Sequence, residues 1–249
     1  MTAINTERLV DWFQGHAGQT LLRQQRLAIE DGIAHCFGYH QLEFLVDSRL
    51  PVGEYSRLGH RILAVPEWQP DLPESTLVCL PHEIPLGSDA IDLVILHHTL
   101  DVAEQPHQTL REVARVLRSG GHLVVTGFNP FSWWGLRHLV EWHRREPWNL
   151  RFLRASRLED WLSLLDFRVR SVNLQAARPP LLRSESLRRW GLVSRLVKRL
   201  KLPVGSFYVI VAQKRAGCLT PVARSWKSRR LVGLASVHPL VPCKSDEKR

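Results

Sequence analysis

Short apolar runs alternate with polar stretches along the chain from about residue 41 onwards. The runs are rich in aliphatic and β-branched residues and do not alternate with polar ones, which is typical of strands covered on both faces. They lie at residues 42–47, 61–65, 75–80, 91–96, 122–128, 167–174 and 207–213. The pattern therefore predicts seven strands.

Helical periodicity appears before and between these runs. It covers residues 5–30, 105–117 and 155–165. Pro106 suits a first helical turn, and we expect Gly120–Gly121 to stop this helix and turn the chain into the next strand. Strands that alternate with helices predict a doubly wound, mainly parallel sheet.

The fold class is therefore α/β, with three parts along the chain. Residues 1–40 form a helical N-terminal extension, and residues 41–215 hold a seven-stranded Rossmann-like sheet. Residues 216–249 mix Arg, Lys, Ser and Pro without steady periodicity, which predicts a basic, loosely attached or disordered tail.

Composition places the chain among soluble intracellular proteins. The four cysteines are widely spaced and form no C-x-x-C pair, which argues against a zinc knuckle or a disulfide framework and indicates a reducing cytoplasm. The N-terminus has no apolar core of signal-peptide length, and no apolar stretch is long enough to cross a bilayer. We expect a cytoplasmic protein.

The net charge of +10 lies mostly near the C-terminus, because residues 214–249 hold nine Lys/Arg and two Asp/Glu. A second basic segment, Arg188–Lys201, lies in a predicted amphipathic helix at 184–201. Such segments attract nucleic acid or an anionic membrane non-specifically. The alternative is that the apolar face of the helix covers the sheet and its basic face is solvated.

Residues 81–128 hold a series of landmarks: Pro85 and Leu86 precede "DAIDLVIL", and a helix ending in "REVARVLRSGG" and the strand "HLVVTGF" follow. In this order they resemble the fourth strand, the next helix and the fifth strand of class I S-adenosylmethionine-dependent methyltransferases, of the type 11 group. The weaker resemblance of the flanking segments extends it to about residues 41–215. It implies the seven-stranded fold above and S-adenosylmethionine as cofactor.

The resemblance implies a cofactor site around the ends of the first four strands. The glycine-rich loop of the family corresponds to "DSRLPVGEYSRLGH", which is poor in glycine and has Pro51 where flexibility is usual. Glu67 stands where an acid holds the ribose, and His82 or Glu83 replaces the acid that contacts adenine. The implied cofactor residues are Asp47, Ser48, Gly53, Glu67, His82, Glu83, His97 and His98.

The stretch "ILHHTLDV" (95–102) joins two adjacent histidines to Asp101 at the end of a predicted strand. Adjacent residues of a strand point to opposite faces, so only one of the histidines can face a crevice, and a metal site needs more converging ligands. We therefore expect a strand-end loop, with no metal. One histidine faces cofactor or substrate, or both pack structurally; His98 is the candidate catalytic base.

Aromatic residues are dense in residues 128–149, where the resemblance places a substrate lid. Aromatic side chains beside a crevice hold a planar or apolar substrate and exclude water. The alternative is a surface helix packed against the core. The candidate substrate residues are Asn129, Phe131, Trp133 and Trp134.

The sequence thus supports a methyltransferase that acts on an unidentified acceptor. The glycine-poor loop favours an alternative, a catalytically inactive protein of the same fold that serves as a binding or scaffold module. A third possibility is a protein that associates with RNA or a membrane surface through its basic helix and tail.

Overall fold

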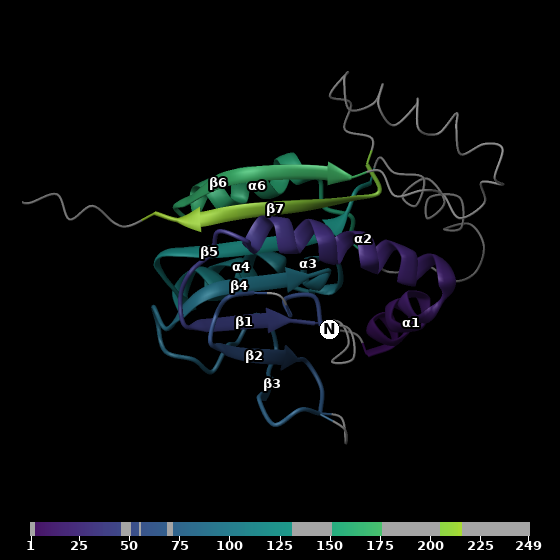
Figure 1. Cartoon of the computed structure of the whole chain (residues 1–249), viewed down its shortest axis with the longest axis horizontal. Helices are drawn as coiled ribbons and strands as arrows, with labels where there is room; N and C mark the ends of the chain where they lie inside the picture. The colour runs from purple at the N-terminus through teal and green to yellow at the C-terminus, as the bar shows by residue number, and fades with distance from the viewer. Residues whose placement is uncertain are drawn as a thin grey trace, which may run out of the picture. The chain divides into compact units, whose positions relative to one another are not determined.

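The computed structural model describes residues 3–45, 51–54, 56–68, 72–130, 151–175 and 205–215. Seven strands form one sheet in the order β3-β2-β1-β4-β5-β7-β6 (Figure 1). The strands are β1 (His40–Phe44), β2 (His60–Val65), β3 (Thr76–Val78), β4 (Ile91–His97), β5 (Leu117–Phe128), β6 (Phe167–Gln175) and β7 (Phe207–Lys214). The helices are α1 (Ala3–Gln14), α2 (His16–Ile33), α3 (Thr99–Val102), α4 (Pro106–Val116) and α6 (Ala155–Leu164).

The pairing confirms a mainly parallel, doubly wound sheet. Strand β1 pairs in parallel with β2 and with β4, and β2–β3 and β4–β5 are parallel as well. Strand β7 lies antiparallel between β5 and β6. The chain order reverses between β1 and β4, where doubly wound proteins form their ligand crevice.

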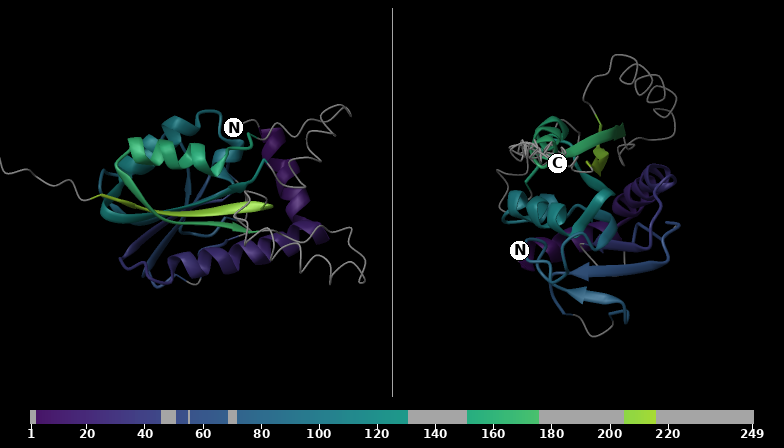
Figure 2. Two further views of the ribbon diagram at one scale, coloured as in Figure 1. Left: turned by 90° about the horizontal axis from the view of Figure 1, so that it is seen from above. Right: turned by 90° about the vertical axis from the view of Figure 1, so that its left-hand side faces the viewer.

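Each face of the sheet carries its own apolar core. On one face, Leu93 and Ile95 of β4 pack with Leu22 and Ile29 of α2. On the other face, strand residues that include Val94 and Leu96 pack with α4 and α6. Figure 2 shows the sheet between α2 on one side and α4 and α6 on the other. Because both faces are buried, the strands need continuous apolar runs, which explains the pattern in the sequence.

The connection between β1 and β2 is short and holds no helix among its described residues. Val52 and Leu58 of this connection join the core beneath α2. The N-terminal helices thus belong to the same compact unit as the sheet, Met1–Gly217, while Cys218–Arg249 forms a second unit outside the described residues. The predicted N-terminal extension supplies much of the cover of this face.

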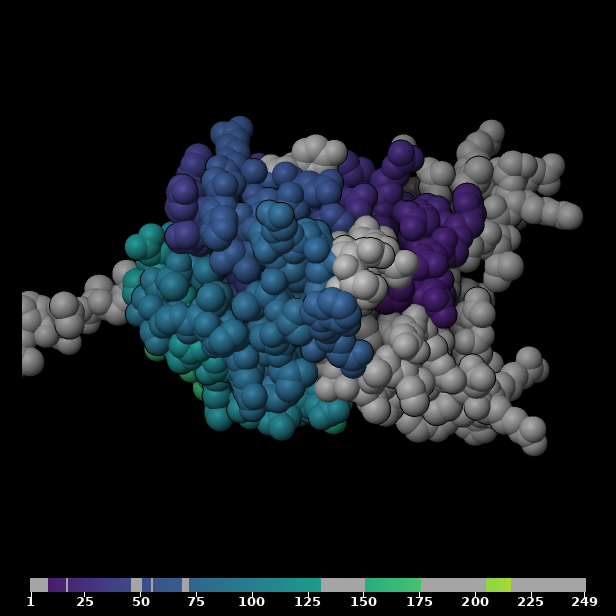
Figure 3. Space-filling model, turned by 90° about the horizontal axis from the view of Figure 1, so that it is seen from below, coloured from purple at the N-terminus to yellow at the C-terminus, as the bar shows by residue number. Residues whose placement is uncertain are grey.

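Strand β3 forms one edge of the sheet. It has only three residues, which range from half-buried to exposed. The space-filling view from below shows the surface that the chain forms on this side (Figure 3). A short edge strand limits unwanted pairing with other chains.

The predicted role of Gly120–Gly121 as the helix stop is wrong. Helix α4 ends at Val116 and β5 begins at Leu117, so both glycines lie inside the strand. The register advances by two residues in β4, from Ile91 to Leu93, while β5 advances from Leu117 to His122. Gly120 has a φ of +83° in this irregular part of the ladder, a conformation that glycine adopts without strain.

Gly18 lets α2 approach the end of α1. A Cβ at this position would lie 2.2 Å from the Trp12 carbonyl oxygen and 2.5 Å from the Phe13 Cα. Gly18→Ala should lower the free energy of unfolding by about 1–3 kcal/mol, because this clash outweighs the gain of about 1 kcal/mol in helix propensity. Urea denaturation measures the difference.

The matched control is Gly87→Ala, because a Cβ at Gly87 meets nothing within 4 Å. This variant should be as stable as the wild type or slightly more so. A Gly18→Ala protein that matches the control would contradict the close packing of α1 against α2.

Candidate functional site

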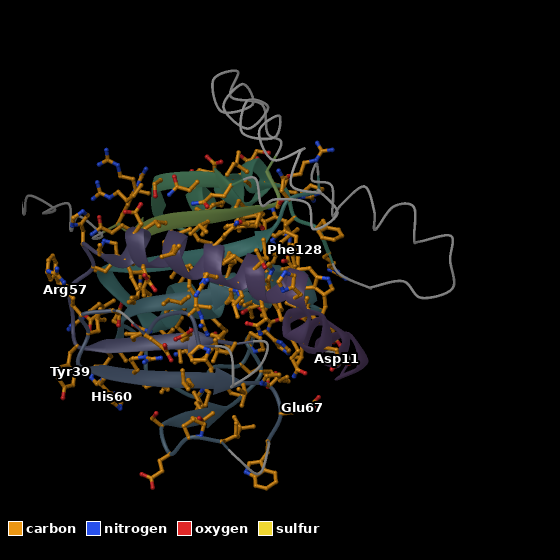
Figure 4. The ribbon with its side chains drawn as sticks, turned by 45° about the vertical axis from the view of Figure 1, so that its right-hand side comes forward. Asp11, Tyr39, Arg57, His60, Glu67 and Phe128 are labelled. Atoms are coloured by element: carbon orange, nitrogen blue, oxygen red, sulfur yellow. The ribbon has the colours of Figure 1, made fainter. Side chains whose placement is uncertain are left out.

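The carboxyl ends of the parallel strands meet at one edge of the sheet. Helix α1 lies at this edge, beyond the ends of β1 and β4 (Figures 1 and 2). Glu67, Phe128 and Asp11 all lie at this end of the molecule (Figure 4). We call it the carboxyl edge, and it is where a doubly wound sheet binds its ligand.

His97 ends β4, and His98 follows it in a left-handed conformation with a φ of 53°. This turn brings both rings towards the same residue of α2. Gln25 Oε1 lies 2.9 Å from His97 Nε2, and Gln25 Nε2 lies 2.8 Å from His98 Nε2. One glutamine side chain therefore bridges the two histidines.

The bridge fixes the tautomers of both rings. An amide oxygen only accepts and an amide nitrogen only donates, so His97 carries its proton on Nε2 and His98 accepts at Nε2. Neutral His98 then holds its proton on Nδ1, which donates to Asp101 Oδ2 at 2.8 Å. The same oxygen accepts the Phe128 backbone N–H at 3.0 Å. The network thus links α2, β4, α3 and β5.

Burial controls the ionisation of this network. It lowers the pKa of His98 to about 3 and the pKa of His97 well below its ordinary value. It also raises the pKa of Asp101 well above its ordinary value, although the Phe128 hydrogen bond opposes this. Both histidines are therefore neutral at physiological pH.

An aromatic cluster covers the histidines. The Phe13 ring of α1 lies 5.6 Å from the His97 ring and 5.4 Å from the His98 ring, measured between centroids. Phe128 lies 4.1 Å from His98, and Trp12 packs edge-on against Phe128 at 6.0 Å. Phe13 is fully buried, so it seals this part of the carboxyl edge.

These contacts bear on the two alternatives for the histidine pair, in which one ring faces cofactor or substrate or both rings pack structurally. Both residues lie at the end of β4 as expected, but neither ring faces a crevice, since His97 is 1% exposed and His98 is 0% exposed. Both ring nitrogens of His98 already have partners. A catalytic role for His98 stays a prediction that this arrangement does not support.

Gly53 lies on the face of the sheet, against β1 and β4. Its N–H and that of Val52 donate to Glu43 Oε1 at 3.0 Å and 2.6 Å. Burial raises the pKa of Glu43, and these two backbone hydrogen bonds oppose the shift. A Cβ at Gly53 would lie 2.3 Å from Gln41 Nε2, so the glycine allows the loop to pack on β1.

Glu67 lies at the carboxyl edge with its side chain exposed, just after β2. The turn after β3 holds a half-buried His82 and an exposed Glu83. Asn129 follows β5 and is buried, and its N–H donates to the Ser206 carbonyl at 3.2 Å. Of the predicted ligand residues, Glu67 and Glu83 present exposed carboxylates.

Several predicted residues lie outside the described part of the chain. They are Asp47 and Ser48, the aromatic residues Phe131, Trp133 and Trp134, the basic segment Arg188–Lys201 and the tail 216–249. Their roles stay predictions. Among the described residues, no group of three or more His, Cys, Asp and Glu side chains could hold a metal ion, and no helix is long and apolar enough to span a membrane.

Three residues of this region, Gln25, Glu43 and Phe13, were not among the predicted site residues. Gln25 lies three or four positions from Leu21, Leu22, Ala28 and Ile29, all of them buried. A polar residue on the apolar face of a helix indicates a buried partner, and this signal could have found Gln25. Glu43 gives a similar signal, because it interrupts an apolar strand.

The two buried histidines predict loss of stability in acid. In the unfolded chain they titrate near pH 6.5, so below that pH the unfolded state binds about two protons that the folded state does not. Asp101 and Glu43 act in the opposite direction, because burial raises their pKa values in the folded chain. Each buried histidine should lower the free energy of unfolding as the pH drops from about 6.5, by at most about 1.4 kcal/mol per unit. Urea titrations between pH 7 and pH 4.5 measure this slope.

His98→Gln should make the free energy of unfolding depend less on pH, because it removes one of the two histidines that bind a proton only in the unfolded chain. The exposed His35 provides a control, since His35→Gln should leave the slope unchanged. Equal slopes in wild type and His98→Gln would contradict burial of a neutral His98.

Comparison with known proteins gives a family match and a set of related folds. Residues 64–125 match the model of a methyltransferase domain family. The chain is 37% identical over 155 residues to the uncharacterized protein YafS of Escherichia coli (strain K12), a match that covers 61% of this chain. The match spans 60% of the length of that relative.

Two solved structures share the fold. A SAM-dependent methyltransferase of Thermotoga maritima matches with a TM-score of 0.60 and 19% identity, over 85% of this chain and 99% of that chain. A SAM-dependent methyltransferase of Archaeoglobus fulgidus matches with a TM-score of 0.56 and 15% identity, over 82% of this chain and 97% of that chain. The chain therefore has the class I methyltransferase fold.

Proposed function

We propose that this chain, whose residues 64–125 match the model of a methyltransferase domain family, transfers a methyl group from S-adenosylmethionine to an acceptor molecule. The observation that carries the proposal is this family match. It begins inside β2, ends inside β5 and includes Glu67, His82 and His97. The sheet order, with β7 antiparallel beside β5, supports it.

The described part of the carboxyl edge fits the adenosine half of the cofactor. Glu67 is exposed after β2, where its carboxylate can accept hydrogen bonds from the two ribose hydroxyls. His82 and Glu83 follow β3, next to β2 in the sheet, and would lie towards the adenine. Asp47 and Ser48 would hold the amino-acid half.

The cofactor supplies an activated methyl group when it is bound, and the protein supplies position. Transfer needs the acceptor atom in line with the methyl group, so holding both partners lowers the barrier most. Phe13 and Phe128 exclude water from one side of the edge. With His98 engaged by Gln25 and Asp101, the described residues favour an acceptor that needs no strong base.

One observation favours a second candidate, an inactive protein of the same fold that serves as a scaffold. Gly53 packs on the face of the sheet, where its N–H donates to Glu43 and a Cβ would meet Gln41 Nε2. Close backbone approach to the cofactor then depends on other residues of this connection. The two candidates differ in a single property, which is whether the cofactor binds.

Calorimetric titration of S-adenosylmethionine and S-adenosylhomocysteine into the purified full chain tests the proposal. We expect binding in the micromolar range, and Glu67→Ala should weaken it about tenfold or more, because a carboxylate that accepts two hydroxyl hydrogen bonds contributes about 1.5–3 kcal/mol.

Glu74→Ala is the matched control, since Glu74 is an equally exposed acid in the β2–β3 connection. It should bind the cofactor as the wild type does. Absence of binding to the folded wild-type chain at millimolar cofactor would reject the methyltransferase and leave the scaffold.

A further inference from the structure

A pair of histidines lies at the end of the sheet opposite the carboxyl edge. His40 begins β1 and His60 begins β2, and the two are direct partners in the parallel register. Figure 4 shows His60 and Tyr39 at this end, away from Glu67 and Phe128. Nothing in the methyltransferase proposal uses these side chains.

The two rings approach each other closely. His40 Nδ1 lies 3.0 Å from His60 Nδ1, and the ring planes are 82° apart. His60 is exposed and His40 is half-buried, so solvent reaches the pair. The Tyr39 ring packs edge-on against His40, with 4.8 Å between centroids.

Hydrogen bonds hold the backbone beneath the pair. The His40 N–H donates to Asp92 Oδ2 at 3.0 Å, and the His60 N–H donates to the Tyr39 carbonyl at 2.8 Å. These bonds fix the separation of the two Cα atoms, and the two rings stay accessible to solvent. The pair is thus pre-organised for a ligand that both nitrogens can bind.

We propose that His40 and His60 chelate one divalent transition-metal ion, with Cu²⁺ preferred. Neutral imidazole nitrogens are the typical protein ligands of Cu²⁺, Ni²⁺ and Zn²⁺. Two nitrogens about 2.0–2.1 Å from a metal lie about 2.9 Å apart at a right angle and about 3.3 Å apart at a tetrahedral angle. The observed 3.0 Å lies between these two values, and Cu²⁺ is preferred because it stands highest in the Irving–Williams order.

The ion replaces a hydrogen bond that contributes little. In the free pair one Nδ1 donates and the other accepts, and an exposed hydrogen bond of this kind stabilises the fold by about 1 kcal/mol or less. A small rotation of each ring points both lone pairs at a shared position outside the strand ends. Because no third metal-binding side chain joins the pair among the described residues, water fills the remaining coordination positions.

The charges around the pair set how strongly the ion is held. Asp92 adds a carboxylate beneath His40, but Arg118 Nη1 already pairs with its other oxygen at 2.9 Å. Arg57 lies at the same end of the molecule and is exposed (Figure 4). These charges oppose one another, so the two imidazoles determine the affinity for the metal ion. The bound ion should therefore exchange with ions in solution.

Calorimetric titration of CuCl₂, NiCl₂ and ZnCl₂ into the untagged full chain tests the proposal. We expect one Cu²⁺ per chain with an affinity in the micromolar range, and weaker binding of Ni²⁺ and Zn²⁺ in accordance with the Irving–Williams order. Electron paramagnetic resonance of the Cu²⁺ complex should show two equatorial imidazole nitrogens.

His40→Asn and His60→Asn should each lower the Cu²⁺ affinity by about tenfold or more, because each removes one of two ligands. His35→Asn, at an exposed histidine of the loop before β1, should bind Cu²⁺ as the wild type does. Circular dichroism checks that each variant is folded. Cu²⁺ binding that survives both substitutions, or no binding by the wild type at millimolar Cu²⁺, would overturn the proposal, and neither result bears on cofactor binding.

Discussion

The short connection between β1 and β2 imposes the main constraint on this structure. It holds no helix among its described residues, and Val52 and Leu58 of the connection join the apolar cluster on this face of the sheet. Helix α2 covers β4, β5 and β7 in the same cluster, while Gly53 of the connection packs over Gln41 and Glu43 of β1. Much of the rest of the site depends on this arrangement, because α2 carries Gln25 and positions α1.

The packing of α1 and α2 also determines the environment of His97 and His98. A strand end that opened into water would present His97 or His98 to a ligand. Here the Gln25 side chain forms a hydrogen bond with one nitrogen of each ring, and Asp101 accepts a hydrogen bond from the other nitrogen of His98. Phe13 packs against both rings. These neutral buried rings and their hydrogen bonds stabilise a specific arrangement of four elements. The exposed acids at the carboxyl ends of the strands are then the groups that can contact a cofactor.

A parallel sheet gathers like ends of its strands, and this gives the molecule two chemically different edges. The carboxyl edge combines Glu67 with an aromatic cover, which suits a cofactor with a ribose and an acceptor that is shielded from water. At the opposite end, where the parallel strands begin, the first residues of β1 and β2 lie together, and in this chain both are histidines. The two edges are distinct sites, so a ligand at one has no direct contact with the other.

The sequence by itself determined the strands, the helices α2, α4 and α6 and the fold class, because buried strands and amphipathic helices leave periodic patterns that local physics explains. It also placed Glu67 and the histidines at strand ends. Only the tertiary structure decided that Gly53 lies on β1, that Gln25 bridges His97 and His98, and that His40 meets His60. These contacts join residues that are 12 to 73 positions apart. Such contacts depend on sheet order and register, and a one-dimensional pattern of polarity does not contain either.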